Sequence, residues 1–242
     1  MNYLNDTSIT YLGHATVLIE TPGGKLILID PWTIGNPACP EEFRNVKNLG
    51  QLDIILLTHI HNDHAGDAES IIKANSQAVV VCIADAETWL AKKGAVNLSP
   101  MNKGGSQLVA GIEIAMTHAE HSSSFNEEDG SVVYGGEAAG YVLKLENGFT
   151  IYDAGDTALF GDMALIRELY KPELALLPIG DLFTMGPVQA ALAIKLLGVH
   201  QVLPIHYDTF PILTGTPAEL QKLTSDIPGL KIHALKPGET LR

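Results

Sequence analysis

Short apolar runs separated by turn residues recur along the 242-residue chain, and their spacing predicts a mixed α/β protein. Near the N-terminus we expect strands at Ser8–Leu12, Val17–Glu20 and Lys25–Asp30, with the turn Thr21-Pro22-Gly23-Gly24 joining the second strand to the third. The segment Leu52–Thr58, which is apolar from Ile54 to Leu57, ends abruptly in histidines. That pattern is typical of a buried strand that delivers a loop.

Strand and helix patterns then alternate through the rest of the chain. The further expected strands are Ala78–Ile83, Gly111–Thr117 (with the alternation of an edge strand), Tyr141–Glu146, Phe149–Tyr152, Leu174–Leu177 and Gln201–Leu203. The expected helices are Asp67–Asn75, Ala84–Lys93, Thr157–Tyr170, Pro187–Leu197 and Pro217–Thr224. In each half a hairpin precedes strand, loop and helix, which predicts two similar halves packed face to face in a layered α/β sandwich. Because no linker interrupts the pattern, we expect residues 1–242 to form a single domain.

Composition narrows the possible partners and compartment. Hydrophobic residues make up 46% of the chain, which excludes a disordered protein, and 28 acidic against 15 basic side chains give a net charge of −13. This acidity argues against nucleic-acid binding. No apolar run is long enough to cross a bilayer, and Met1–Leu12 does not resemble a secretory leader. With only Cys39 and Cys82, no disulfide framework is expected, so we predict a cytoplasmic protein that binds neither membrane nor nucleic acid.

The sharpest chemical feature is the run from His59 to His64, which holds three histidines and an aspartate within six residues. His59 and His61 are two positions apart, and Asp63 follows two positions later. A strand end that turns into a helix can therefore direct the first pair at one metal ion while Asp63 and His64 reach a second. Imidazole and carboxylate ligands suit Zn²⁺, Fe, Mn²⁺ or Ni²⁺.

Two further candidate ligands stand where apolar strands end. Asp156 follows Ile151-Tyr152-Asp153, and His206 follows Val202-Leu203-Pro204-Ile205. Such strand ends are where α/β folds place ligand sites. A solvated turn carboxylate and a hydrogen-bonded core histidine are the alternative interpretations. His118 and His121 both end the Gly111–Thr117 strand, and either can supply another ligand.

The run at 59–64 matches the His-x-His-x-Asp-His motif of the metallo-β-lactamase superfamily, and the chain resembles that superfamily over its whole length. The other segments that carry the resemblance are Gly13-His14-Ala15, Leu28-Ile29-Asp30-Pro31, Gly155–Phe160, Pro178-Ile179-Gly180-Asp181 and Pro204-Ile205-His206-Tyr207. Together they resemble the branch of small bacterial and archaeal metal-dependent hydrolases related to the ascorbate-6-phosphate lactonase type. The resemblance implies a four-layer αββα sandwich with a dinuclear metal site at one edge of the sheets.

The resemblance also implies two divalent metal ions, with Zn²⁺ as the first choice and Mn²⁺, Fe or Ni²⁺ as alternatives. The implied ligands are His59, His61 and His121 for the first metal, and Asp63, His64 and His206 for the second, with Asp156 bridging both. His121 is preferred to His118 because His121-Ser122-Ser123 matches the turn found in the family. Asp63 and His64 are the expected catalytic residues, Asp63 as a proton shuttle.

Several residues around this constellation are expected to support it. His14 resembles a pocket position or a partner of a ligand, with a structural turn histidine as the alternative. Asp30 is expected to orient a ligand histidine through its ring N–H, unless it is a plain turn carboxylate. The segment Ser122–Gly140 is interpreted as a lid, a subunit contact or a solvated loop. The expected pocket wall, in the stretch Asp181–Pro187, is formed by Asp181, Thr184 and Met185.

These features predict a dinuclear metal-dependent hydrolase that directs a metal-bound hydroxide at a small, anionic ester, lactone or phosphoester. The positive metals within an acidic protein favour a small electron-rich substrate over a polyanion. The alternatives are a metal-dependent phosphodiesterase or nuclease, and a non-hydrolytic di-metal redox or binding protein. The expected partners are a small-molecule substrate and, as a further option, other copies of the chain.

Overall fold

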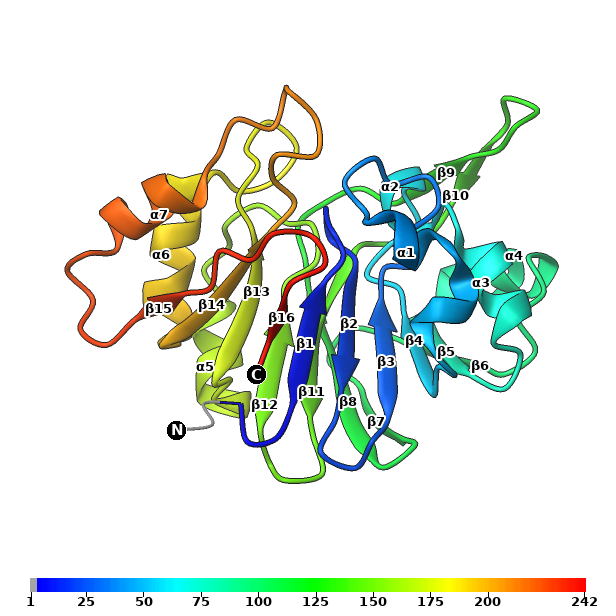
Figure 1. Ribbon diagram of the computed structural model, residues 1–242, viewed down its shortest axis with the longest axis horizontal. Helices are drawn as coiled ribbons and strands as arrows, with labels where there is room; N and C mark the ends of the chain where they lie inside the picture. The colour runs from blue at the N-terminus through cyan, green and yellow to red at the C-terminus, as the bar shows by residue number, and fades with distance from the viewer. Residues whose placement is uncertain (1–3) are drawn as a thin grey trace.

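The computed structural model describes residues 4–242, and within this range the strands form two mixed seven-stranded sheets that pack face to face (Figure 1). The first three residues of the predicted domain, which also begin the segment Met1–Leu12, lie outside the described residues. The first sheet runs, in spatial order, β16 (Thr240–Leu241), β1 (Ser8–Tyr11), β2 (Val17–Glu20), β3 (Leu26–Ile29), β4 (Ile54–Leu56), β5 (Val79–Ile83) and β6 (Leu98–Met101). The second runs β15 (Lys231–Ile232), β14 (Gln201–Ile205), β13 (Leu174–Pro178), β12 (Thr150–Asp153), β11 (Ala139–Lys144), β8 (Ile112–His118) and β7 (Ser106–Val109).

The two sheets repeat one plan. In the first sheet β2 is antiparallel to β3, with Val17 opposite Ile29, and the strands from β3 to β6 run parallel. In the second sheet β11 is antiparallel to β12, with Tyr141 opposite Asp153, and the strands from β12 to β15 run parallel. A hairpin followed by parallel strands therefore occurs in each half, as the sequence predicted.

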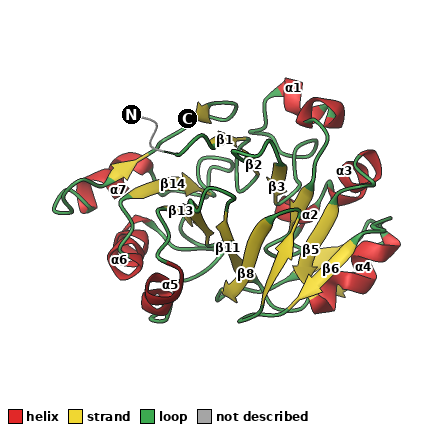
Figure 2. Cartoon of the chain, turned by 90° about the horizontal axis from the view of Figure 1, so that it is seen from below, coloured by secondary structure: helices red, strands yellow, loops and turns green. Residues whose placement is uncertain are grey.

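Helices cover the outer faces of both sheets, which makes the predicted four-layer αββα sandwich (Figure 2). Those beside the first sheet are α1 (Glu41–Arg44), the 3₁₀ turns η1 (Val46–Leu49) and η2 (Ala84–Ala86), α2 (Asn62–Ala65), α3 (Ala68–Ala74) and α4 (Glu87–Lys92). Those beside the second sheet are α5 (Met163–Tyr170), α6 (Pro187–Leu197) and α7 (Pro217–Leu223). None of the helices within residues 4–242 combines the length and the apolarity that crossing a membrane requires.

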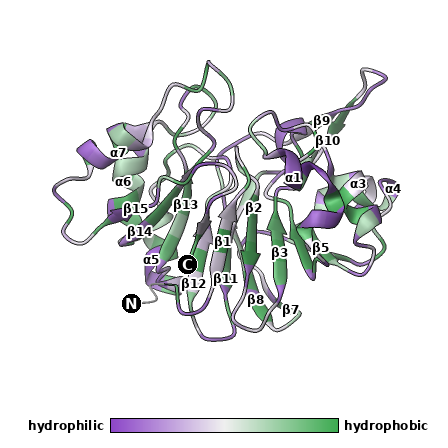
Figure 3. Ribbon diagram, in the orientation of Figure 1, coloured by the Kyte–Doolittle hydropathy of each residue, from purple (hydrophilic) through white to green (hydrophobic). Residues whose placement is uncertain are grey.

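The apolar core lies mainly between the sheets, whose strands are the most hydrophobic part of the fold (Figure 3). Ile19 and Ile29 of the first sheet belong to the same buried cluster as Met116 and Leu143 of the second. A separate buried cluster joins the outer face of the second sheet to α5 and α6. Each fully buried aliphatic side chain contributes roughly 1.5–3 kcal/mol. The core therefore fixes how the two sheets face each other, and with it the edge where their loops meet.

β8 is not the edge strand that its alternating pattern predicted. It lies between β11 and β7, and β7 forms the edge of the sheet. The alternation covers only the start of the strand, where Glu113 is exposed between Ile112 and Ile114, whereas the residues from Ile114 to Thr117 are all buried. The buried second half of the strand is what an interior position requires.

The predicted helix at Thr157–Tyr170 begins only at Met163. The preceding residues form a loop whose polar groups bond across to the loop that follows β8. The Thr157 hydroxyl accepts from the Glu120 N–H at 2.9 Å, and the Ala158 N–H donates to the Glu120 carbonyl at 3.1 Å. The Thr157 carbonyl, which a helix beginning here would use, instead accepts from the Met185 N–H at 3.0 Å. Likewise, the predicted helix at Ala84–Lys93 is divided into η2 and α4.

Candidate metal centre

The candidate ligands stand in segments that follow strands of both sheets, and these strands, labelled in Figure 1, end at one edge of the sandwich. His59 comes three residues after β4, Asp156 three residues after β12, and His206 directly after β14. His121 comes three residues after β8. The loops after these strands thus converge from two sheets on one region, which is the usual place for a site in an α/β fold.

Hydrogen bonds tie the two sheets together at this edge. The Ala139 N–H donates to the Thr58 carbonyl at 2.9 Å, and the buried Tyr141 hydroxyl donates to the Leu57 carbonyl at 2.8 Å. Gly155 fits into this junction with a φ of +57°, and a Cβ there would stand 2.8 Å from the Thr58 Cβ. Only glycine meets both demands, so the residue before Asp156 is constrained by the contact between the sheets.

The first group of candidate ligands comprises His59, His61 and His121. His61 Nδ1 lies 2.9 Å from His59 Nε2 and 3.3 Å from His121 Nε2. Burial lowers the pKa of all three imidazoles, and together with the neighbouring His121 it lowers the pKa of His61 to about 4. Three neutral imidazoles thus face one point, which is the form in which histidine binds a metal ion.

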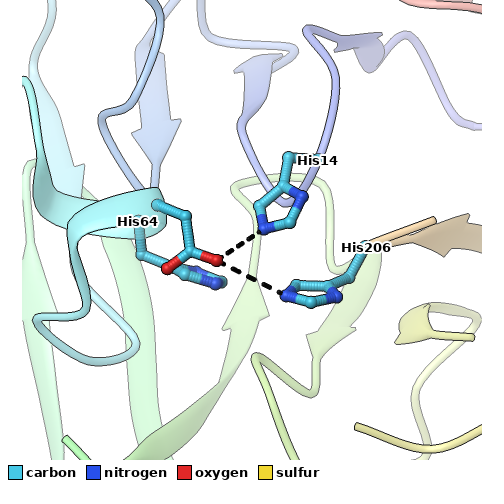
Figure 4. Close-up of side chains that lie close together, drawn as sticks. His14, His64 and His206 are labelled. Carbon is cyan, nitrogen blue, oxygen red and sulfur yellow. Dashed lines mark hydrogen bonds and ion pairs between the residues drawn. The ribbon is translucent and has the colours of Figure 1, made fainter. Parts of the chain in front are cut away.

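The second group comprises Asp63, His64 and His206, and the structure adds His14 to it (Figure 4). One ligand atom from each of these four residues lies within 4.8 Å of the others. Asp63 Oδ2 is 3.0 Å from His14 Nε2 and 3.9 Å from His206 Nε2. The Asp63 side chain is 34% exposed, whereas the three histidine side chains are buried, so Asp63 is the member of this group that reaches solvent.

Asp156 lies between the two groups. Its Oδ2 is 3.0 Å from His206 Nε2 and 3.2 Å from His64 Nε2, and it is 3.6 Å from His121 Nε2 and 4.0 Å from His59 Nε2. A single buried carboxylate oxygen therefore approaches histidines of both groups.

Asp30 fixes the ring orientation of one histidine directly and of another indirectly. Its carboxylate accepts hydrogen bonds from the Thr58 N–H at 2.8 Å, the Thr58 hydroxyl at 2.7 Å and His64 Nδ1 at 2.7 Å. Because the Thr58 hydroxyl donates to Asp30, its oxygen accepts from His59 Nδ1, 3.0 Å away. When these rings are neutral, the Nε2 atoms of His59 and His64 therefore carry the lone pairs, and they are turned towards Asp156. Asp30 therefore contacts His64 directly through the ring N–H and contacts His59 through the Thr58 hydroxyl.

The arrangement fits divalent metal ions better than it fits a self-contained hydrogen-bond network. Among the described residues, Asp156 Oδ1 is buried and accepts no hydrogen bond. Neighbouring imidazole nitrogens face one another, and only protons or cations can relieve the repulsion between their lone pairs. Nitrogen and carboxylate oxygen ligands suit Zn²⁺, Mn²⁺, Fe or Ni²⁺. Cys39 and Cys82 are not in these groups, and burial raises the pKa of their thiols to about 11 and about 12.

The backbone is strained where it delivers these side chains. His14, Asp30 and His206 have positive φ values of 57°, 49° and 54°. Left-handed conformations cost non-glycine residues free energy and persist where surrounding contacts enforce them. Here the His206 N–H donates to the His14 carbonyl at 2.7 Å, and the Tyr11 hydroxyl donates to the same carbonyl at 3.1 Å. Local strain thus brings two imidazoles to the same point.

The carboxylates make His64 behave differently from the other histidines. Burial alone would lower the pKa of His64. The carboxylates of Asp156 and Asp30 raise it by more, so the pKa of His64 lies well above its ordinary value. Without a metal ion the proton on His64 compensates the buried charge of its partners. A cation that binds here must displace that proton, so its binding is coupled to pH.

The remaining predicted positions belong to none of the ligand groups. His118 is exposed and approaches Lys103, whereas His121 is the residue beside His61. Asp181 is exposed and its side chain accepts from the next backbone N–H, and Met185 is buried in the apolar cluster beneath α6. The Thr184 hydroxyl bonds the Met185 carbonyl. A pocket-wall role for Asp181, Thr184 and Met185 stays a prediction.

The segment 122–140 contains a hairpin of β9 (Ser124–Asn126) and β10 (Val132–Tyr134) that projects from the body of the protein (Figure 1). The Asn62 side chain bonds the Asn126 backbone twice, at 2.9 and 3.0 Å, which links the hairpin to the histidine motif. A cleft of about 1160 Å³ lies between this hairpin and α3 and α4. Its walls include Trp32 and Asn62 but none of the candidate ligands, so the chemistry belongs to the histidine cluster rather than to this hollow.

Sequence reasoning missed two of the residues that fix the ring orientations. Thr58 and Thr209 hold His59 and His14 by their Nδ1 atoms. Thr58 directly precedes His59, and a hydroxyl beside a candidate ligand is a signal that could have been used. Thr209 is 195 residues from His14 in the chain, and no local pattern connects them.

Comparisons with known proteins show what this chain is similar to. The model of the beta-lactamase superfamily domain matches residues 25–207, a range that includes His59 to His206 and leaves out His14. The chain is 52% identical to a UPF0173 metal-dependent hydrolase of Koribacter versatilis over 237 residues, 98% of each chain. Its structure is similar to that of Igni18, a novel metallo hydrolase from the hyperthermophilic archaeon Ignicoccus hospitalis, with a TM-score of 0.85 and 36% identity over 97% of each chain. The metallo-beta-lactamase fold protein YhfI of Bacillus subtilis shares the fold, with a TM-score of 0.70 and 14% identity over 98% of this chain and 99% of that chain.

Proposed function

Since this chain belongs to the UPF0173 metal-dependent hydrolase family of the beta-lactamase superfamily, it is a metal-dependent hydrolase, and we propose that it uses two divalent metal ions to hydrolyse a small, electron-rich ester, lactone or phosphoester. In this proposal His59, His61 and His121 bind the first ion, Asp63, His64 and His206 bind the second, and Asp156 bridges them. Zn²⁺ is the first candidate for both positions.

One observation carries the dinuclear proposal, namely the position of Asp156. Its Oδ2 approaches His206 and His64 of one group at 3.0 and 3.2 Å, and His121 of the other at 3.6 Å. A carboxylate that served one metal ion only would have no reason to lie between two sets of imidazoles.

The charges of the site support a small, electron-rich substrate. Two divalent cations would bring four positive charges against the two negative charges of Asp63 and Asp156, within a chain of net charge −13. A small anion or a polarised carbonyl compound is attracted to such a centre, whereas a polyanion must also approach the acidic surface. For this reason we place the phosphodiesterase or nuclease alternative second.

Asp63 and His64 have different roles in this proposal. Bound divalent cations supply a water of lowered pKa and polarise the oxygen of the scissile group. Asp63, the exposed carboxylate of the second group, is positioned to accept a proton and pass it to the leaving group. His64 is fully buried between Asp30 and Asp156, which suits a ligand better than a group that contacts substrate.

Metal analysis coupled to a substrate screen tests this function. Chelator-treated protein is reloaded with Zn²⁺, Mn²⁺, Fe²⁺ or Ni²⁺, and its metal content and its turnover of small esters, lactones, phosphomonoesters and polymeric nucleic acid are measured. We expect two metal equivalents per chain and turnover of one of the small-molecule classes. Asp156→Asn should lower the metal content and abolish turnover. Asp226 is an exposed carboxylate paired with Lys195, so Asp226→Asn should change neither the metal content nor the turnover. One equivalent at saturation contradicts the dinuclear centre, and preferred turnover of polymeric nucleic acid favours the second-placed alternative.

A further inference from the structure

His14 belongs to the second ligand group, although it comes from a different part of the chain than the histidine motif. It follows β1 and is fully buried, with its ring 4.0 Å from that of His206. Its Nε2 is 3.0 Å from Asp63 Oδ2 (Figure 4). The family match begins after His14, at residue 25. Its role therefore has to be argued from its own contacts.

The opposite side of the ring determines what His14 Nε2 can do. His14 Nδ1 lies 3.0 Å from the Thr209 hydroxyl, and that hydroxyl donates its single proton to the Tyr207 carbonyl at 3.3 Å. The Thr209 oxygen must then accept from His14 Nδ1–H if both contacts are satisfied. A neutral imidazole has only one N–H, so Nε2 carries a lone pair that faces the Asp63 carboxylate.

Two acceptors facing each other at 3.0 Å repel unless a cation lies near both. The same arrangement holds for the two best-oriented candidate ligands. His59 is held at Nδ1 by Thr58 and His64 is held at Nδ1 by Asp30, and both present Nε2 to Asp156. His14 is thus held in the way that protein metal ligands are usually held, by a hydrogen bond from the ring nitrogen that does not bind the metal.

From this geometry we infer that His14 is a further ligand of the second metal position, which it binds through Nε2 beside Asp63, His64 and His206. The inference rests on the proposed function, because it presupposes that position. With Asp156 included, the second position has five protein ligands and the first has four. The second position then suits a cation that accepts five or six ligands, and the first leaves more room for substrate.

The positive φ of His14 makes asparagine the best replacement, since asparagine tolerates the left-handed region. The side-chain amide of asparagine or glutamine at this position can still donate a hydrogen bond towards Asp63, but it is a poor metal ligand. His14→Asn and His14→Gln therefore separate ligation from simple orientation of Asp63. His200→Gln is the matched control, because His200 is an exposed histidine remote from the cluster.

The experiment is a titration of chelator-treated protein with Co²⁺, followed by visible absorption and by competition with a chelator. The d–d absorption of Co²⁺ depends on the number and type of its ligands, and orientation of Asp63 alone would leave it unchanged. We expect both His14 variants to bind one equivalent at least about tenfold more weakly and to show a changed spectrum for it. His200→Gln should match the wild-type protein. Urea unfolding in the presence of chelator shows which variants remain folded.

A wild-type spectrum in either folded variant overturns the inference, whether or not the affinity falls. If the wild-type protein binds a single equivalent, the two-metal function is contradicted, and the spectrum of that one equivalent in the variants still decides for or against His14. If the wild-type protein binds no Co²⁺, both proposals fall.

Discussion

Replacing Asp30 with asparagine should invert the tautomers of two histidines at once. The oxygen of the introduced amide can still accept from the Thr58 N–H, but its NH₂ group would face the Thr58 hydroxyl and His64 Nδ1, where the carboxylate accepted two hydrogen bonds at 2.7 Å. His64 Nδ1 must then accept, which moves its proton to Nε2. The Thr58 hydroxyl must donate elsewhere, and its nearest acceptor is His59 Nδ1 at 3.0 Å. Both Nε2 atoms would carry protons where lone pairs are needed.

Loss of a partner that orients a metal ligand lowers metal affinity by about 10–100-fold, which corresponds to about 1.4–2.7 kcal/mol. Since Asp30 serves one histidine of each group, we expect both metal equivalents of Asp30→Asn to bind more weakly by this factor. Thr58→Val removes only the link to His59, so it should weaken the first position and spare the second. Competition between protein and chelator for Zn²⁺ measures both affinities.

Asp53→Asn is the matched control. Asp53 joins the same pair of strands at their opposite end, where it accepts from Leu26 N–H at 3.0 Å and from Lys25 Nζ at 2.9 Å. Its replacement should lower stability without changing metal affinity. Two Zn²⁺ equivalents bound by folded Asp30→Asn within about twofold of the wild-type affinities would refute the tautomer argument.

Three further outcomes are expected. His59→Ala removes one of the three imidazole ligands of the first group, so this variant should bind one metal equivalent instead of two. Metal analysis that still finds two tightly bound equivalents would contradict this. Burial and the neighbouring Asp30 raise the pKa of Asp153 from 3.8 to about 8, so the native metal-free protein binds a proton that the unfolded chain has released. The free energy of unfolding should therefore fall as the pH rises from about 4 to about 8, by on the order of 5 kcal/mol, and Asp153→Asn should flatten this dependence in urea unfolding of chelator-treated protein. Parallel profiles would show that Asp153 is not the source. Tyr141→Phe removes the buried hydrogen bond to the Leu57 carbonyl at 2.8 Å, and it should lower the free energy of unfolding by about 1–3 kcal/mol in the same urea experiment. An unchanged unfolding midpoint would mean that water replaces the hydroxyl.

The sequence predicted the plan of the fold because its main signals are strong and local. Short apolar runs such as 54–57, bounded by polar residues, favour strands buried on both faces, and the hairpin turns indicated how those strands connect. Two-residue strands such as β15 and β16 carry no periodicity of their own and pair only because a neighbouring strand offers hydrogen-bonding groups. Such elements are set by the tertiary structure, so no local pattern indicates them.

The histidine motif was recognisable for a similar reason, since six consecutive residues hold four of its side chains. What the sequence could not provide is the direction of each ring. The tautomer of His59 depends on a hydroxyl proton that Asp30 draws away, and His14 depends on Thr209. The first relation exists only once β3 and β4 have paired, and the second only once the two sheets have packed. The helix predicted at 157–170 was too long for the same reason, because Thr157 and Ala158 bond to Glu120 and Met185, which are distant in the sequence.

Neither half of the sandwich holds a complete set of candidate ligands. His59, His61, Asp63 and His64 follow a strand of the first sheet, whereas His121, Asp156 and His206 follow strands of the second. Metal affinity in this protein therefore depends on how accurately the two halves are positioned relative to each other. A substitution in the intersheet core that shifts one sheet by a fraction of an ångström would first become visible as a weaker metal complex, before the melting temperature changes. Conversely, two bound ions would cross-link the two halves and stabilise their packing against each other.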